Sequence, residues 1–394
     1  MAISDARRTA LPTLEDVARA AGVSRATVSR VVNGAPNVST DLQRLVQDAI
    51  AAVGYVPNRA ARQLITGRSG VIALVMSIAH GPAEHEPSLD GAAPEDAVPE
   101  DATLSDPALD TATHDASADA ADSSADSSAE ASPARVFADP FFGRIVAGVL
   151  GFLRPRHLHP LLMLAEDEAS RAQVLDHLRQ GAADGALVVS IDPADPLPGL
   201  LLEAGLPAVF FARPERPLPV RYVDLAHQDG GRLAAERLLA QGRRQVAAIA
   251  GPLALHAGRA RLDGFCDTMA RHGVAYVPYT VGNFTQDSGE RAMRELLERE
   301  PQLDGVFAAN DLMAVGALHA LRERGRRVPQ DVAVIGFDDS SAAASARPRL
   351  TTVRQPVEAM AARMAQLLLE RLDEPDSPPR AVLFDTELVV RASG

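Results

Sequence analysis

Two arginines lie on a short segment whose spacing suits the reading of DNA bases. The segment GVSRATVSRVVNG (residues 22–34) carries Arg25 and Arg30 and has no acidic residue. A guanidinium group can hold a guanine edge through two hydrogen bonds, and each such pair discriminates between bases by about 1–3 kcal/mol. On a helix whose valines face inward, the outer side would carry Arg25, Ala26, Ser29, Arg30 and Asn33.

Two short helices joined at a glycine would position this outer side. Thr13 is a good N-cap for the first helix, with Asp16 three residues later, and Ser24 can cap the second helix. Gly22 between them permits a sharp turn. The pattern predicts a helix-turn-helix, whose second helix enters the major groove of DNA. A helical hairpin with a solvated outer face is the alternative that spacing alone leaves open.

The charge of the chain is divided between regions. The formal net charge is -13, yet residues 82–134 hold fourteen acidic residues and no arginine, which leaves +1 for the rest. Residues 1–70 carry nine arginines against five acidic residues. A modest basic region on an otherwise nearly neutral chain is compatible with nucleic-acid binding.

The acidic segment is rich in Ala, Asp, Ser and Pro and has no aromatic residue. It cannot bury enough apolar surface to offset the entropy lost on ordering. We therefore expect residues 80–135 to form a disordered insert. Its simplest role is a solvated surface loop, and screening of DNA or binding of a partner is the alternative.

After residue 134, short apolar runs alternate with amphipathic helical stretches. Runs such as HPLLMLA, GALVVS and DVAVIGF are separated by stretches such as SRAQVLDHLRQG and DLMAVGALHALRERG. This order predicts a doubly wound α/β layout with parallel strands. The run SGVIALVM before the insert is expected to be the first strand. The insert would then lie in a loop at the carboxyl ends of the strands, where such sheets bind ligands.

Several other classes of protein are disfavoured. Cys266 is the only cysteine, so no intrachain disulfide can form, which suits a reducing compartment. No long apolar run and no signal-peptide core is present, so we expect a cytoplasmic, nucleoid-associated protein without a membrane contact. No phosphate-binding, dinucleotide or serine-hydrolase motif occurs, so we expect no catalytic residues and no cofactor. His157 and His159 are a close pair without a third ligand nearby, so a surface turn is favoured over a metal site.

The stretches TLEDVARAAGVSRATVSRVVNG and STDLQRLVQDAIAAVGYVPNRAARQLITGRSG closely resemble the LacI/GalR (lactose-repressor) family of bacterial transcription regulators. The resemblance implies an all-α helix-turn-helix head plus a hinge helix, followed by a two-lobed α/β core like the type I periplasmic binding proteins. The expected domains are the helix-turn-helix at 1–56, the hinge helix and linker at 57–69, and the effector-binding and dimerisation core at 70–394, with the insert at 80–135.

The resemblance also assigns roles in DNA binding. The family's base-reading pair falls on Arg25 and Ala26, and since alanine offers no hydrogen bond, Arg25 would carry most of the pair's specificity. A hinge-helix leucine that wedges between base pairs falls on Leu64, and unstacking of this kind costs a few kcal/mol per step. Arg59, Arg62 and Arg68 would contact phosphate. The full expected set is Thr13, Ser24, Arg25, Ala26, Thr27, Ser29, Arg30, Asn33, Asn58, Arg59, Ala61, Arg62 and Leu64.

The core of the family holds its ligand between two lobes that three chain segments connect. Here the crossings are expected in YVDLAHQDGG, in LTTVRQP and near AVLFDTELVVR. The resemblance places effector contacts on Phe141, Phe142, Ser190, Arg213, Arg261, Phe284, Asn310, Asp338 and Gln355. These residue types suit a polyol, since hydroxyls both donate and accept and an aromatic face can cover a sugar ring.

Some of these residues have simpler structural roles as alternatives. Asn310 could cap the helix that begins DLMAVGAL, Asp338 and Asp339 could cap a following turn, and Arg259 could simply pair with an acid. One departure follows the run PAVFF, where many sugar-binding members of the family have aspartate but this chain has Ala212 and then Arg213. That change could favour an acidic or larger ligand.

The expected function is a ligand-responsive repressor of carbohydrate uptake or catabolism genes. It would bind a palindromic double-stranded operator as a homodimer and be released by a small-molecule effector, with a sugar favoured. A corepressor-dependent regulator that senses a purine or a phosphorylated metabolite is the alternative. A transport-type binding protein fits less well, because of the DNA-binding head.

Overall fold

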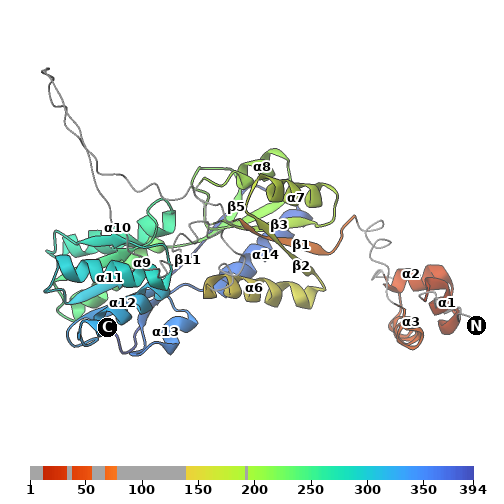
Figure 1. Cartoon of the computed structure of the whole chain (residues 1–394). Coiled ribbons are helices and arrows are strands. Elements are labelled where there is room, and N and C mark those ends of the chain that lie inside the picture. Colours follow the sequence, from red (N-terminus) through yellow and green to blue (C-terminus); the bar gives the residue numbers. More distant parts are fainter. Residues whose placement is uncertain (1–11, 33–37, 56–66, 78–138, 191–193) are drawn as a thin grey trace, which may run out of the picture. The chain divides into compact units, whose positions relative to one another are not determined.

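The computed structural model describes residues 12–32, 38–55, 67–77, 139–190 and 194–394 (Figure 1). The acidic insert and part of the hinge region fall outside them. So do six of the residues expected to bind DNA: Asn33, Asn58, Arg59, Ala61, Arg62 and Leu64.

The head consists of three short helices. These are α1 (Leu14–Ala21), α2 (Arg25–Val32) and α3 (Thr40–Val53). Thr13 caps α1 in a reciprocal capping box with Asp16, and Gly22 ends it at a φ of 65°, as the sequence predicted. Val17 and Val28 are fully buried in a small core shared with α3. The helix-turn-helix expectation is confirmed.

The amino-terminal lobe is a six-stranded sheet of order β11-β5-β4-β3-β1-β2, in which all paired strands are parallel. Helices α7 and α8 cover one face, and α6 and α14 cover the other. Its strands are β1 (Val71–Ser77), β2 (His159–Ala165), β3 (Gly185–Ser190), β4 (Ala208–Phe211), β5 (Arg221–Leu225) and β11 (Ala381–Phe384). Its helices are α6 (Pro140–Leu153), the short η1 (Arg154–Arg156), α7 (Glu168–Arg179), α8 (Leu197–Glu203) and α14 (Val357–Asp373).

The carboxyl-terminal lobe is a second six-stranded sheet, of order β12-β10-β9-β8-β6-β7, in which only β12 pairs antiparallel. Helices α11 and α12 cover one face, and α9 and α10 cover the other. Its strands are β6 (Val246–Ala250), β7 (Tyr279–Val281), β8 (Gly305–Ala308), β9 (Ala333–Asp338), β10 (Thr351–Arg354) and β12 (Glu387–Val389). Its helices are α9 (His227–Ala240), α10 (His256–Arg271), α11 (Gln286–Arg299), α12 (Asp311–Glu323) and α13 (Ser341–Ser345).

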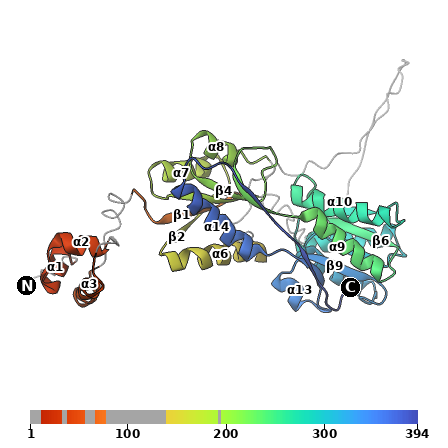
Figure 2. The ribbon, with the colours of Figure 1, turned by 180° about the vertical axis from the view of Figure 1, so that it is seen from behind.

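The chain passes between the two sheets three times, where the sequence predicted crossings. It leaves the amino-terminal lobe between β5 and α9, and returns between β10 and α14 (Figure 2). The final passage runs from β11 to β12. Within the described residues, no helix is both long and apolar enough to span a membrane.

Candidate DNA-reading helix and effector site

Helix α2 presents a polar face opposite its buried valines. The Ser24 hydroxyl accepts a hydrogen bond from the Thr27 backbone N–H at 3.2 Å and lies 2.9 Å from the Thr27 hydroxyl, so it starts α2 as predicted. Val28 is fully buried, whereas Arg25, Ala26 and Arg30 are exposed. The side chains predicted to read bases therefore lie on the exposed face of a helix whose other face packs into the core of the head.

Arg25 makes a solvent-exposed ion pair in the absence of DNA. Its Nη1 lies 3.1 Å from the Glu15 carboxylate, and the two side chains are 69% and 53% exposed. Ion pairs this exposed contribute about 0–1 kcal/mol, so a guanine edge can replace Glu15 at little cost. Arg68 is engaged more firmly: one of its nitrogens lies 2.8 Å from the Asp373 carboxylate and another donates to the Leu372 carbonyl at 2.6 Å. Its expected phosphate contact would require both bonds to be given up.

Replacing Arg25 should reduce operator affinity and relax specificity at one base pair. We expect Arg25→Met to weaken binding to the selected operator about 5- to 150-fold, the equivalent of 1–3 kcal/mol for one bidentate guanine contact. Fluorescence anisotropy with DNA selected by the wild-type chain measures this. Arg19→Met, at a 79% exposed position on α1, is the control. An equal loss on selected and random DNA would mean that Arg25 only contacts phosphate.

Arg261 is the centre of a buried polar cluster in the carboxyl-terminal lobe. Its guanidinium donates from Nε to His227 Nδ1 at 3.2 Å and from Nη2 to Gln355 Oε1 at 3.0 Å. Nη1 donates to the Ala309 carbonyl at 2.6 Å and lies 3.5 Å from the Asp338 carboxylate. The guanidinium carbon is 3.7 Å from the centre of the Phe337 ring, a cation–π geometry. Three predicted effector residues, Arg261, Asp338 and Gln355, are thus brought together.

Several residues with a positive φ lie at the carboxyl edge of the two sheets, near this cluster. Ala212, Phe284, Asp338 and Asp339 have φ values of 71°, 65°, 110° and 53°. Each ends a strand or lies within three residues after its end, on β4, β7 or β9. Positive φ in residues other than glycine is costly and concentrates at functional sites. The carboxyl edge of parallel strands is also where α/β sheets bind ligands.

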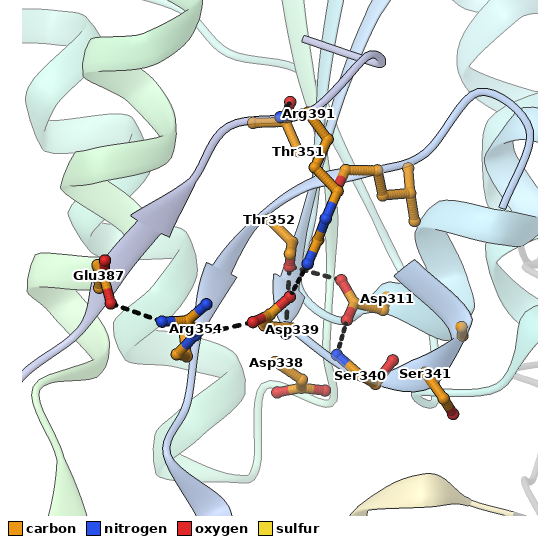
Figure 3. Close-up of polar contacts among 12 residues, drawn as sticks. Asp311, Asp338, Asp339, Ser340, Ser341, Thr351, Thr352, Arg354, Glu387 and Arg391 are labelled. Atoms are coloured by element: carbon orange, nitrogen blue, oxygen red, sulfur yellow. Dashed lines mark hydrogen bonds and ion pairs between the residues drawn. The ribbon is translucent and has the colours of Figure 1, made fainter. Parts of the chain in front are cut away.

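Asp339 does not cap the turn that follows β9, contrary to one prediction. Its carboxylate accepts from Arg354 Nε at 2.8 Å and pairs with Arg391 (Figure 3). Burial raises the pKa of Asp339, but the hydrogen bonds from the two arginines lower it further, below its usual value. The N-cap of α13 is Ser340, whose N–H donates to Asp311 at 2.7 Å. Tertiary partners here displace the local cap that the sequence suggested.

Both carboxylate oxygens of Asp311 accept hydrogen bonds from other parts of the protein. It is 1% exposed and accepts from the Thr352 hydroxyl at 2.6 Å as well as from Ser340 (Figure 3). Burial raises its pKa to about 6, although these hydrogen bonds act in the opposite direction. The carboxylate joins the start of α12 to β10 and to the turn after β9, and so supports the strained position of Asp338.

Asn310 caps α12 and also supports Phe284. Its side-chain oxygen accepts from the Met313 N–H at 2.9 Å, and its amide nitrogen donates to the Phe284 carbonyl at 2.9 Å. The capping prediction for Asn310 is confirmed. The Phe284 ring lies against Gly251, where a Cβ atom would come within 2.3 Å of a ring carbon. Asn310 and Gly251 thus fix the expected sugar-stacking ring.

A second chain of contacts leads from Arg213 to Arg261. The Arg213 Nε donates to Asp224, whose other oxygen lies 3.5 Å from His227 Nε2. Burial alone raises the pKa of Asp224, but hydrogen bonds with His227 and Arg213 bring it down to about 2. Burial lowers the pKa of His227 to about 4, against the effect of Asp224. His227 is therefore neutral near pH 7, and because Nδ1 accepts from Arg261, its proton lies on Nε2 and faces Asp224.

The burial of neutral His227 should make stability depend on pH. Between about pH 6.5 and 4, His227 of the unfolded chain is protonated whereas folded His227 stays neutral. The stability of the folded state therefore falls as pH falls. From pH 7.5 to 5 this amounts to about 2 kcal/mol. Urea unfolding should show that His227→Gln loses less stability over this interval than wild type. The exposed His177→Gln control should retain the wild-type loss, and identical curves for all three proteins would contradict the assignment.

The remaining effector predictions fall on the amino-terminal lobe. Phe141 meets Phe142 and Phe211 edge-on, with ring centres 5.4 Å apart in both pairs. Phe142 is only 5% exposed and belongs to the lobe's core, while Ser190 ends β3 and is partly exposed.

Arg259 lies on α10, two residues from Arg261. It pairs with Glu215 at 2.8 Å, as its simpler interpretation predicted.

Sequence reasoning missed His227 and Phe337 as partners of Arg261. His227 lies within the segment identified as a crossing, but nothing local links it to an arginine 34 positions away. His157 is the C-cap of η1 and His159 begins β2, and both are exposed. The described residues hold no group of three or more potential ligands that could bind a metal ion.

Comparison with known families assigns both parts of the chain. Residues 13–58 match the model of bacterial regulatory proteins of the lacI family, and residues 235–394 match a periplasmic binding protein-like domain. The HTH-type transcriptional regulator CelR of Thermobifida fusca is 39% identical over 388 residues, which cover 97% of this chain and 98% of the relative. The lactose operon repressor of Escherichia coli is 29% identical over 343 residues, 87% of this chain and 80% of the relative.

Solved structures agree with these matches. The complex of the transcriptional regulator CelR with cellobiose has a TM-score of 0.66 at 38% identity and covers 97% of this chain and 100% of its own. The lac repressor dimer bound to operator and the anti-inducer ONPF has a TM-score of 0.69 at 25% identity, with 97% and 99% covered. The chain therefore belongs to the LacI family of DNA-binding bacterial transcriptional regulators and is not an enzyme.

Proposed function

We propose that this chain is a sugar-responsive repressor of carbohydrate uptake or catabolism genes, and that its effector is cellobiose or a closely related disaccharide. As a homodimer it would place two α2 helices about one DNA turn apart on a palindromic operator. The observation that carries the proposal is the buried cluster in which Arg261, Gln355 and Asp338 converge. The solved complex of CelR with cellobiose supports this choice of sugar.

The charge balance around Arg261 favours a neutral ligand. Arg213 pairs with Asp224, Arg259 with Glu215, and Arg261 lies against Asp338. Each cation is matched by a carboxylate, so a phosphate would find no uncompensated positive charge among these residues. Sugar hydroxyls, which donate and accept, can exchange with such bonds without leaving a charge unpaired. The added charge of Arg213, two residues after PAVFF, is balanced by Asp224 and does not by itself create an anion site.

Isothermal titration and thermal unfolding of the full chain test the proposal. Cellobiose at about 100 times its dissociation constant should stabilise the protein by about 2.7 kcal/mol. It should also release operator DNA selected by the wild-type chain. Glucose 6-phosphate and hypoxanthine represent the corepressor alternative. Stabilisation by one of these, with no response to cellobiose or other disaccharides, would overturn the sugar assignment.

A further inference from the structure

Arg144 connects a helix of the amino-terminal lobe to two backbone carbonyls of the effector site. Its Nη1 donates to the Asp338 carbonyl and its Nη2 to the Gln355 carbonyl, both at 2.9 Å. The same guanidinium makes a bidentate pair with Glu358, with both nitrogen–oxygen distances 2.7 Å. The Arg144 side chain is 18% exposed and its bonds to the two carbonyls are partly buried, whereas the Glu358 side chain is 50% exposed.

Glu358 holds the guanidinium in place from the amino-terminal lobe. Arg144 lies on α6 and Glu358 on the first turn of α14, and the two helices pack so closely that a Cβ on Gly148 would come within 2.4 Å of the Glu358 carbonyl oxygen. Bidentate pairs of arginine with carboxylate are strong and geometrically specific. Arg144 is therefore oriented from one lobe while it also donates to Asp338 of the other lobe and to Gln355 in the crossing between them.

Asp338 and Gln355 are engaged from two sides. Their side chains face Arg261, whose Nη1 lies 3.5 Å from the Asp338 carboxylate and whose Nη2 lies 3.0 Å from the Gln355 amide oxygen. Their carbonyls accept from Arg144. Asp338 also has a φ of 110°, a conformation that must be stabilised by its surroundings. A ligand that moves either side chain would therefore disturb the Arg144 bonds.

We propose that Arg144 is a positioning residue that couples the effector site to the amino-terminal lobe. Its two bonds to the Asp338 and Gln355 carbonyls stabilise one arrangement of β9 and the β10–α14 crossing relative to α6, and they are lost when the lobes adopt another. The bias between the two arrangements then sets how much effector is needed to release DNA, since a ligand shifts an equilibrium only by its differential affinity for the two states. The identity of the effector rests on the proposed function, but the coupling of the lobes does not.

A distance measurement on the ligand-free chain tests the coupling directly. In a Cys266→Ser background, spin labels at Arg179→Cys on α7 and Arg299→Cys on α11 report the separation of the lobes by pulsed electron paramagnetic resonance. Arg144→Met should broaden or shift the distance distribution, and Glu358→Gln should do so to a smaller extent. Arg154→Met, at an exposed position just beyond α6, is the control. A distribution identical to wild type for Arg144→Met would overturn the proposal.

Operator release by cellobiose provides the second readout. We expect Arg144→Met to change the cellobiose concentration that releases half of the operator by about 5-fold or more, the usual scale of allosteric coupling. A changed release concentration with an unchanged distance distribution would mean that Arg144 only supports the ligand directly, and would also overturn the proposal. A changed distribution in a chain that does not respond to cellobiose would refute the sugar assignment and leave the coupling supported. If Arg144→Met does not fold, Arg144→Lys takes its place in both measurements with the same expected results. Lysine keeps the charge but cannot reach all four acceptors.

Discussion

Arg261→Met abolishes the response to cellobiose while the ligand-free protein still binds its operator; this is the largest functional effect that we expect. Arg261 is 5% exposed and donates to His227, Gln355 and the Ala309 carbonyl. Methionine fills much of the same volume but offers no donor to a sugar hydroxyl. Loss of charge-assisted hydrogen bonds in a buried site should weaken cellobiose binding about 100-fold or more, which corresponds to about 2.7 kcal/mol.

Calorimetry and operator anisotropy on the same preparations separate a ligand role from a structural one. Arg271→Met, at the exposed end of α10, is the matched control and should leave both affinities close to wild type. Arg261→Lys retains the charge but not the planar fork, so it should remain strongly impaired for cellobiose. If Arg261→Met loses operator binding together with cellobiose binding, the residue is needed for the fold and not for effector recognition.

Most helices and strands of this fold could be predicted because they follow local patterns of apolar, capping and turn residues. The apolar runs HPLLMLA and GALVVS coincide with β2 and β3, and Thr13, Gly22 and Ser24 mark helix ends in the head as their chemistry suggests. The three crossings followed from the family resemblance. The order of the strands in each sheet was not predicted, since local patterns do not specify which strands pair. The longest helix that was not predicted is α14, although its sequence is amphipathic.

The contacts within the site could not be predicted in the same way, because they join residues far apart in the chain. Arg261 meets Gln355 across 94 positions, and Arg144 meets Asp338 across 194. Local patterns suggested that Asn310 and Asp339 would each act as a cap. Only the first exists, because Arg354 and Arg391 reach Asp339 from β10 and from the end of the chain. Which of several possible partners a polar side chain takes is decided by tertiary packing, and the positive φ of Asp338 likewise has no local signal.

Gly231→Ala should cause the largest loss of stability among the substitutions considered, because α9 and α10 cross at van der Waals contact of their backbones. A Cβ on Gly231 would lie 2.1 Å from the Arg261 carbonyl oxygen, and a Cβ on Gly264 would lie 2.0 Å from the Gln228 carbonyl oxygen. Backbone atoms cannot rotate aside as a side chain can, so α10 would have to move. Overpacking costs about 1–3 kcal/mol and occasionally more, and we expect at least the upper end of that range here because the obstacle is main chain.

Urea unfolding of Gly231→Ala against Gly199→Ala tests this interpretation of the helix crossing. Gly199 lies on α8, and a Cβ added there would meet no atom within 4 Å, so alanine should stabilise the chain by about 0.5–1 kcal/mol through its better helix propensity. Because the carbonyl that Gly231 approaches belongs to Arg261, any folded fraction of Gly231→Ala should also bind cellobiose more weakly than wild type. Equal stability of Gly231→Ala and wild type would show that the two helices can separate freely, and α10 could then not be the rigid support on which the position of Arg261 depends.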